Sequence, residues 1–317
     1  MKQIIVFFLT TITLTSALLG FIFAVDPYDK YGNNPFALKT KAVAMARENK
    51  FNMIEYGKKQ YGLILLGSSS AHRFHTEDLK AYTGLTSFNY AVQHTTPEDY
   101  LAITRHILKK QKPKMLMLQM DFYALNKNFP TDTRFYTSPL KPYLVGNVQA
   151  EPDQAWLDQD YFTLGAISDS FKVIWINFFG KVRHLYLEDG NYQKEKPFSD
   201  PIQVTQFAYK DYEIDSVREG YLREIKKLCD ENSIKLVVWT TPYSLEHFNM
   251  IRTNKEISAA YERYVASLES IFGKVVDFAD YTEQKFNSNK YYFDSSHPNR
   301  AMSEEVLKKL KGLGLLD

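Results

Sequence analysis

Two short motifs contain the residue types that acyl transfer through a covalent serine ester requires. A Gly-Ser-Ser-Ser run occupies 67–70, and an Asp-Ser-Ser-His run occupies 294–297. Ser69 would supply the nucleophile, His297 the base, and Asp294 the carboxylate that orients the base. The two motifs lie near opposite ends of the chain, so they can act together only if the fold unites them.

Each motif alone has a simpler interpretation. A run of Gly and Ser is commonly an ordinary loop, and Asp and Ser ahead of Pro298 are typical of a helix cap. A Gly-x-Ser motif directly after a strand, combined with Asp-x-x-His before the final helix, is much rarer and favours chemistry. Residues three apart in a turn point to the same side, so Asp294 is placed to hold His297.

The elements expected between the motifs alternate between strand and helix. Such alternation is typical of a parallel sheet with helices on both faces, and ligands bind beyond the carboxyl ends of its strands. Strands are predicted at 63–66, 87–92, 115–120, 234–240 and 275–278. Helices are predicted at 36–56, from 76, from 96, over 214–229, over 257–272 and from about 298.

Three segments fall outside this alternation. The stretch 4–25 is uncharged and mostly apolar, long enough at about 1.5 Å per residue to cross a ~30 Å bilayer core. We expect 1–25 to be an uncleaved signal-anchor, with 26–60 a juxtamembrane linker and helix. Lys2 favours a cytoplasmic N-terminus, which puts the domain 61–317 outside the cytoplasm. Within that domain, about 127–212 has no sustained period and is interpreted as an insertion near the mouth of the active site.

Composition narrows the possible classes of function. The net charge is only +2 over 317 residues, so no basic field argues for nucleic acid. The single cysteine excludes an internal disulfide and a thiolate-rich metal site. His72 and His75 could join Asp294 and His297 in a metal site, but no known ligand spacing is present, and lining the cleft is the favoured interpretation. No cofactor is implied, and His72 or Arg73 is a candidate for binding an anionic group of the substrate.

These motifs resemble the SGNH/GDSL hydrolase superfamily, in the membrane-anchored branch whose first motif reads Gly-Ser-Ser. The resemblance extends from about Tyr61 to Leu310 and matches Ser69 to the family nucleophile, His297 to its base and Asp294 to the orienting residue. It implies a three-layer flavodoxin-like α/β fold. It also implies ester or acyl-transfer chemistry in the cell envelope, on a glycan or teichoic-type polymer, often beside a multi-pass membrane O-acyltransferase.

The second and third family motifs depart from this pattern. Where a glycine N–H would help to bind the oxyanion, the chain has Asn89-Tyr90-Ala91, and His94 three residues further on, so Ala91 or His94 stands in. Where an asparagine is usual, the chain has Leu118-Gln119-Met120-Asp121, so Asp121 or Gln119 stands in. An anion beside an oxyanion is unfavourable, and the loss of one donor costs roughly 3–4 kcal/mol elsewhere. Slow hydrolysis, or transfer to a positioned hydroxyl, is therefore expected.

The sequence thus predicts an extracytoplasmic serine esterase or O-acyltransferase acting on a cell-envelope polymer. The alternative is a catalytically weak or inactive scaffold of the same fold that partners a membrane O-acyltransferase through the aromatic insertion. Two observations distinguish these alternatives. A short distance between Ser69 and His297 beside an open cleft favours the enzyme, whereas a plugged site favours the scaffold.

Overall fold

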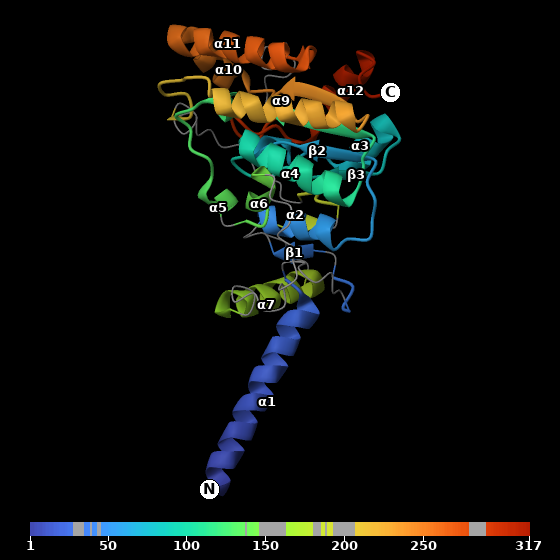
Figure 1. Ribbon diagram of the computed structural model, residues 1–317, viewed down its shortest axis with the longest axis vertical. Helices are drawn as coiled ribbons and strands as arrows, with labels where there is room; N and C mark the ends of the chain where they lie inside the picture. The colour runs from blue at the N-terminus through green and yellow to red at the C-terminus, as the bar shows by residue number, and fades with distance from the viewer. Residues whose placement is uncertain are drawn as a thin grey trace.

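The structure is a computed structural model, and it describes residues 1–27, 35–38, 40–42, 46–136, 138–145, 163–179, 185–187, 189–192, 207–278 and 290–317. In Figure 1, the N-terminal helix extends away from an α/β domain.

A parallel five-stranded sheet forms the centre of the domain. Its spatial order is β3-β2-β4-β6-β7, which places the first strand in sequence between the second and the third. This is the flavodoxin-like order, as the sequence predicted. The strands are β2 (Leu63–Leu66), β3 (Ser87–Asn89), β4 (Met115–Met120), β6 (Lys235–Thr240) and β7 (Val275–Val276).

Side chains alternate between the two faces of the sheet and build two cores. In β2, Ile64 and Leu66 face the larger core, whereas Leu63 and Leu65 face the smaller one. Helices α4 (Pro97–Lys110), α9 (Ser216–Glu231) and α11 (Lys255–Phe272) cover the first face. Helices α3 (Thr76–Thr83) and α12 (Arg300–Gly312) cover the second. All four residues of β2 are buried, as expected for a strand covered on both sides.

Most predicted elements are present, with differences at their ends. The second and fifth strands end at Asn89 and Val276, earlier than predicted. The predicted helix 36–56 is wrong in its first part, because Thr40–Ala42 forms β1 and only Ala46–Glu55 is helical, as α2. β1 pairs antiparallel with β5 (Leu185–Leu187), a partner far away in the sequence that local periodicity cannot reveal.

Helix α1 (Lys2–Val25) corresponds to the predicted anchor. Its length and composition suffice to cross a membrane, a test that a signal sequence also passes. The last turn of α1 packs against α7 (Leu164–Phe179), in a small cluster separate from the two sheet cores. Figure 1 shows α7 lying across the end of α1.

The insertion is therefore less irregular than predicted, since α7 is a continuous helix of 16 residues. The insertion also lies in two places. Helix α7 contacts α1, whereas described residues before and after α7 in the sequence line the cavity described below. The other short elements are η1 (Ser69–Ala71), η2 (Phe122–Leu125), α5 (Thr133–Tyr136), α6 (Lys141–Leu144) and α10 (Leu245–Thr253).

Candidate active site

The carboxyl ends of four parallel strands meet at one cavity of about 440 Å³. Ser69 follows β2, His94 follows β3, Asp121 follows β4 and Tyr243 follows β6, and all four line the cavity together with His297. This is the edge at which open α/β sheets bind ligands. Asp121 and the described residues of the insertion, such as Phe129 and Asp132, line this cavity and leave its volume between them.

Ser69 is presented by a tight turn between β2 and η1. A Cβ added to Gly67 would lie 2.4 Å from the Cβ of Ala71, so the turn needs glycine for space rather than for an unusual backbone conformation. Ser68 caps η1 by accepting a hydrogen bond from the Ser70 backbone N–H. Ser68 and Ser70 are buried, whereas Ser69 is half-buried and faces the cavity.

The structure brings the three predicted residues of the triad together. Ser69 Oγ lies 2.9 Å from His297 Nε2. The other ring nitrogen, His297 Nδ1, lies 2.8 Å from Asp294 Oδ1 and 2.9 Å from Oδ2. Because a carboxylate only accepts hydrogen bonds, Nδ1 carries the proton and Nε2 is left to accept the serine proton.

Asp294 is held in place by the backbone of its own turn. Its Oδ1 accepts hydrogen bonds from the backbone N–H groups of Ser296 and His297, each at 2.9 Å. Burial raises the pKa of this carboxyl, but the hydrogen bonds from the His297 ring and the two N–H groups outweigh burial and hold the pKa below its ordinary value. The motif is not the cap of α12, since Asn299 fills that role.

Two backbone N–H groups beside the nucleophile are placed to bind an oxyanion. Within the described residues, the N–H groups of Ser69 and His94 donate to no protein acceptor. His94 has φ 53°, the left-handed backbone conformation that glycine favours. Ala91 is not available, because its N–H donates to Asn89 Oδ1 at 2.9 Å. Asn89 is structural, and its Nδ2 donates to the carbonyls of Ala71 and Phe74.

Two buried basic side chains from α2, Lys50 and Arg47, fix residues 89–94, which we call the oxyanion segment. This segment continues β3 along the outer edge of the sheet, where carbonyl groups lack a strand partner. Lys50 Nζ donates to the carbonyls of Asn89 and Ala91 at 2.7 and 2.6 Å. Arg47 Nη2 donates to the carbonyl of Gln93 at 3.0 Å.

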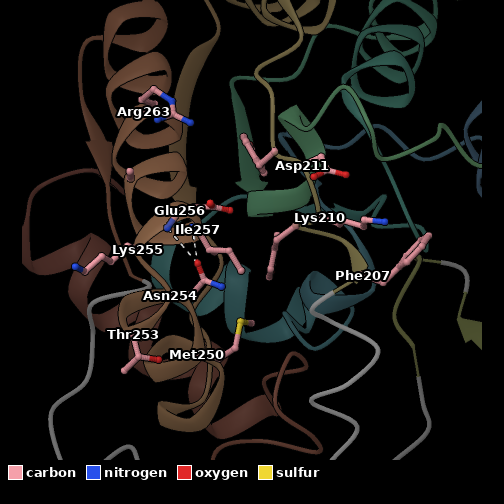
Figure 2. A pocket seen from close by; sticks show the side chains of 13 residues that line it. Phe207, Lys210, Asp211, Met250, Thr253, Asn254, Lys255, Glu256, Ile257 and Arg263 are labelled. Atoms are coloured by element: carbon pink, nitrogen blue, oxygen red, sulfur yellow. Dashed lines mark hydrogen bonds between the residues drawn. The ribbon is translucent and has the colours of Figure 1, made fainter.

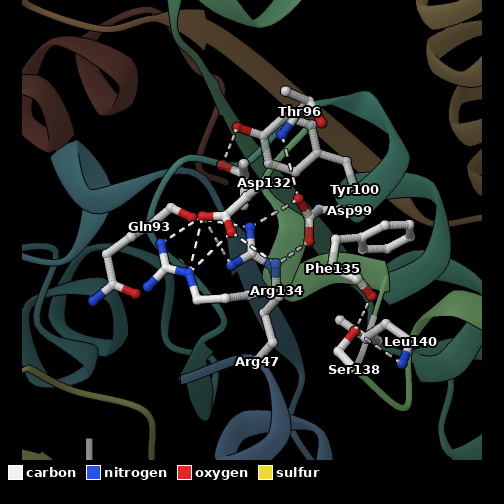
Figure 3. A network of polar contacts seen from close by, with 11 residues as sticks. Arg47, Gln93, Thr96, Asp99, Tyr100, Asp132, Arg134, Phe135, Ser138 and Leu140 are labelled. Carbon is white, nitrogen blue, oxygen red and sulfur yellow. Dashed lines mark hydrogen bonds and ion pairs between the residues drawn. The ribbon is translucent and has the colours of Figure 1, made fainter. Parts of the chain in front are cut away.

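The Arg47 guanidinium is in turn held by carboxylates, as Figure 3 shows. It makes two hydrogen bonds to Asp99, at 2.7 and 3.1 Å, and lies 3.6 Å from Asp132. Asp132 belongs to the wall of the catalytic cavity. Arg47 therefore joins the oxyanion segment, α4 and the insertion. Sequence analysis missed this role, because a charged residue in a short helix gives no signal of burial.

Asp121 lies in a buried polar network behind the nucleophile rather than in the position of an oxyanion donor. Its Oδ1 accepts hydrogen bonds from the hydroxyls of Ser70 and Thr241, at 3.0 and 2.9 Å. Gln119 Nε2 donates to both of those hydroxyls. Burial raises the pKa of Asp121, against the effect of these hydrogen bonds. The network fixes Ser70, and through it the turn that carries Ser69.

A second cavity of about 140 Å³ adjoins the triad on its other side, and it too is lined by Ser69 and His297. His72 and Arg73 form part of its wall, whereas His75, which the sequence also placed in the cleft, lines neither of these two cavities. The Arg73 guanidinium lies over the rings of Tyr192 and Phe293, 4.8 and 4.5 Å from their centroids. Burial lowers the pKa of His72 well below its ordinary value.

His247 also lines the larger cavity. Its Nδ1 lies 3.2 Å from the carbonyl oxygen of Ser295, so Nδ1 carries the proton and Nε2 accepts a hydrogen bond from Tyr209 Oη at 2.9 Å. Burial lowers the pKa of His247 to about 4. It is therefore a neutral positioning group for the turn that carries His297. Among the described residues, no three His, Cys, Asp or Glu side chains are arranged to hold a metal ion.

A larger groove of about 1220 Å³ adjoins the catalytic cavity, since Phe207 and Tyr209 line both. Figure 2 shows its two walls, the segment 207–212 and the N-terminal half of α11. Lys210, Lys255 and Arg263 line the groove and make no ion pair within the described part of the chain. Asp211 and Glu256 line the groove as well, so its described lining has three cationic and two acidic side chains, a small excess of positive charge beside the site.

Comparison with known proteins gives weak structural likenesses only. No family model matches the sequence, and no curated protein matches it. A candidate acylhydrolase from Bacteroides fragilis is 12% identical, with a TM-score of 0.37 over 80% of this chain and 85% of that one. A GDSL-like lipase from Bacteroides thetaiotaomicron is 10% identical, with a TM-score of 0.38 over 80% of this chain and 86% of that one. An activity therefore has to be inferred from the site itself.

Proposed function

We propose that this protein is a serine esterase or O-acyltransferase of the SGNH/GDSL type. The observation that carries the proposal is the continuous chain of hydrogen bonds Ser69–His297–Asp294, with distances of 2.9 and 2.8 Å, at the open end of a parallel sheet. A nucleophile, a base and an orienting carboxylate within hydrogen-bond reach are the geometric signature of covalent acyl transfer.

In the first step, Ser69 Oγ attacks the acyl carbonyl carbon while His297 Nε2 takes the hydroxyl proton. The negative charge that forms on the carbonyl oxygen is bound by the N–H groups of Ser69 and His94. The bond from the carbonyl carbon to the alcohol oxygen then breaks, and His297 returns its proton to the leaving alcohol. Water or a second hydroxyl repeats the sequence on the Ser69 ester, which releases or transfers the acyl group.

The two cavities suggest how an ester lies across the triad. The smaller cavity, about 140 Å³, suits a short acyl group such as acetyl. The larger one, about 440 Å³, has aromatic walls that include Tyr123 and Phe129 and suits a sugar or similar alcohol. We infer that short acyl esters are the substrates and that reaction falls steeply as the acyl chain lengthens.

We further propose that the alcohol belongs to a cell-envelope polymer that follows the adjoining groove. Lys210, Lys255 and Arg263 favour a polymer with phosphate or carboxylate groups. The membrane anchor would be α1, with the domain outside the cytoplasm. A multi-pass O-acyltransferase that supplies the acyl group is the partner we expect, and copurification from membranes under mild detergent tests it.

The decisive test of the activity is kinetic. Purified protein should hydrolyse a chromogenic acetyl ester, and Ser69→Ala should lower kcat by about 10³-fold or more. Ser216→Ala, on the exposed start of α9, is the control and should match the wild type. Equal turnover by the Ser69 variant would exclude Ser69 as the nucleophile.

A further inference from the structure

Helix α7 has two apolar faces, and the described residues of the protein cover only one of them. Its buried residues Ala166, Ser170 and Val173 recur at helical spacing, and Ala166 and Val173 pack against the end of α1. Five large apolar side chains are exposed instead, with fractions of 58–84%: Leu164, Phe171, Trp175, Phe178 and Phe179. At 3.6 residues per turn they fall within one sector of about 100°, opposite the buried face. We name these five residues the α7 stripe.

The α7 stripe is unusual for a surface in contact with water. Contiguous exposed patches of large apolar residues mark interaction sites. Trp175 and Phe179 lie with their ring centroids 4.4 Å apart, so these two rings form one apolar surface. The charged residues of the helix, Asp169 and Lys172, pair with each other at 2.7 Å and lie to one side of the stripe.

The stripe is continuous with the apolar surface of α1. Phe171 contacts Phe21, in the last turns of α1, with ring centroids 4.9 Å apart. Ahead of Phe21, α1 exposes large apolar side chains along its length, including Phe7, Leu14 and Leu18. A bilayer that surrounds α1 ends near its C-terminus, because 24 residues span only slightly more than the ~30 Å hydrocarbon core. The stripe therefore lies at the depth where the membrane meets water.

We propose that α7 is an in-plane membrane helix, with its stripe buried among the lipids on the side of the bilayer where the catalytic domain lies. Trp and Phe at this depth, with charged residues to the side, are typical of interfacial helices. This inference rests on the membrane anchor in the proposed function and adds to it a second contact. One spanning helix would leave the domain free to rotate about it, whereas a second, crosswise contact fixes which way the domain faces.

Site-directed spin labelling of the full-length protein in vesicles of phosphatidylcholine and phosphatidylglycerol tests the proposal. Cys229 does not interfere, because it is buried and burial raises the pKa of its thiol to about 12. Labels are placed at Trp175→Cys and Phe178→Cys. Val217→Cys on α9, exposed to the same 58% as Trp175, is the matched control, and Leu14→Cys on α1 is the bilayer reference.

Collisions with oxygen, which dissolves in lipid, are compared with collisions with a water-soluble nickel chelate. We expect oxygen to dominate at 14, 175 and 178, and the nickel chelate to dominate at 217. Dominance of the chelate at 175 and 178, with oxygen still dominant at 14, would overturn the α7 proposal alone. Dominance of the chelate at 14 would overturn the anchor and the inference with it. Shielding of 175 and 178 that occurs only in native membranes would assign the stripe to a protein partner and contradict the proposal.

Discussion

Ser69 Oγ and His297 Nε2 lie 2.9 Å apart, although 228 positions separate the two residues in the chain. The approach follows from the sheet. β2 carries Ser69 to the carboxyl edge, and Ser244 and His247, from the segment after β6, hold the turn of His297 through the Ser295 carbonyl, at 3.1 and 3.2 Å. The contact between Ser69 and His297 therefore depends on the order of the central strands, because β2 and β6 carry the segments that place these two residues.

The carboxylate of Asp294 is expected to be essential because it fixes the tautomer of His297. Asp294→Asn keeps an oxygen for the two backbone N–H groups but loses the charge that stabilises protonated imidazole. We expect kcat for a chromogenic acetyl ester to fall by about 10²–10⁴-fold, with KM little changed. Asp215→Asn is the control, because asparagine also caps a helix and Asp215 caps α9. Activity in the Asp294 variant within a few-fold of wild type would contradict the role of Asp294.

The triad could be predicted from the sequence because its residues occupy short motifs of fixed spacing. The groups that support it could not. Lys50, Arg47 and His247 act through long-range contacts, and nothing near them in the sequence separates a buried polar residue from a solvated one. Asp121 was predicted at the third motif, but its hydrogen bonds to Ser70 and Thr241 depend on strands far apart in sequence.

Arg47 holds the oxyanion segment through the Gln93 carbonyl, so a change at Arg47 should alter the position of the His94 N–H. Arg47→Lys keeps the charge but loses the fork that joins Asp99 to the Gln93 carbonyl. We expect kcat to fall by about tenfold, with KM nearly constant, because the His94 N–H is displaced from the transition-state charge. Steady-state kinetics on the same acetyl ester measures this.

Arg105→Lys is the matched control for that variant. Arg105 also donates to two backbone carbonyls, those of Tyr143 and Leu144, and it lines neither cavity of the site. Its kcat should remain at the wild-type value. An equal loss in both variants would mean that Arg47 acts through general stability and not through the oxyanion segment.

The fold was predictable wherever periodicity is local. The apolar strands and the stripes of α9 and α11 are short-range patterns, and these elements lie where the sequence places them. β1 was mistaken for helix because its only strand partner is β5, and α7 was missed because it is apolar on two faces. A helix in contact with both a protein and a second apolar environment lacks the single stripe that marks an ordinary surface helix.

The basic groove predicts a substrate-dependent effect of charge. Lys210→Glu with Arg263→Glu should raise KM for an anionic, acylated polymer by about tenfold or more and leave turnover of a small neutral ester unchanged. The effect should weaken as salt is added. Reversal of Lys226 and Lys227, on α9, makes the same change in net charge outside the groove. A similar rise in KM in that control would show that overall charge, and not the groove, attracts the polymer.

The surroundings of Glu55 predict how the free energy of unfolding depends on pH. Burial raises the pKa of its carboxyl, but the hydrogen bonds and charges of His106 and Lys110 outweigh burial and lower the pKa from 4.5 to about 2. A lowered folded-state pKa means that the carboxylate stabilises the protein above about pH 4.5, and that this contribution is lost as the pH falls from there towards 2.

Glu55→Gln should therefore lower the free energy of unfolding at neutral pH by about 1–3 kcal/mol and reduce its change between neutral and acid pH. Denaturant unfolding at several pH values measures both quantities, with the exposed Glu231→Gln as control. An unaltered acid dependence in the Glu55 variant would refute the assignment.

The covalent intermediate gives the most direct measurement of all. Brief mixing of the protein with an activated acetyl ester, acid quenching and intact-mass analysis should reveal a gain of one acetyl group, which peptide mapping locates at Ser69. His297→Ala should accumulate much less of this species, and Ser69→Ala none. Acetylation at a residue other than Ser69 would contradict the assignment of Ser69 as the nucleophile of an acyl-transfer triad. Turnover of the ester by the wild type without any acyl-enzyme would contradict it as well.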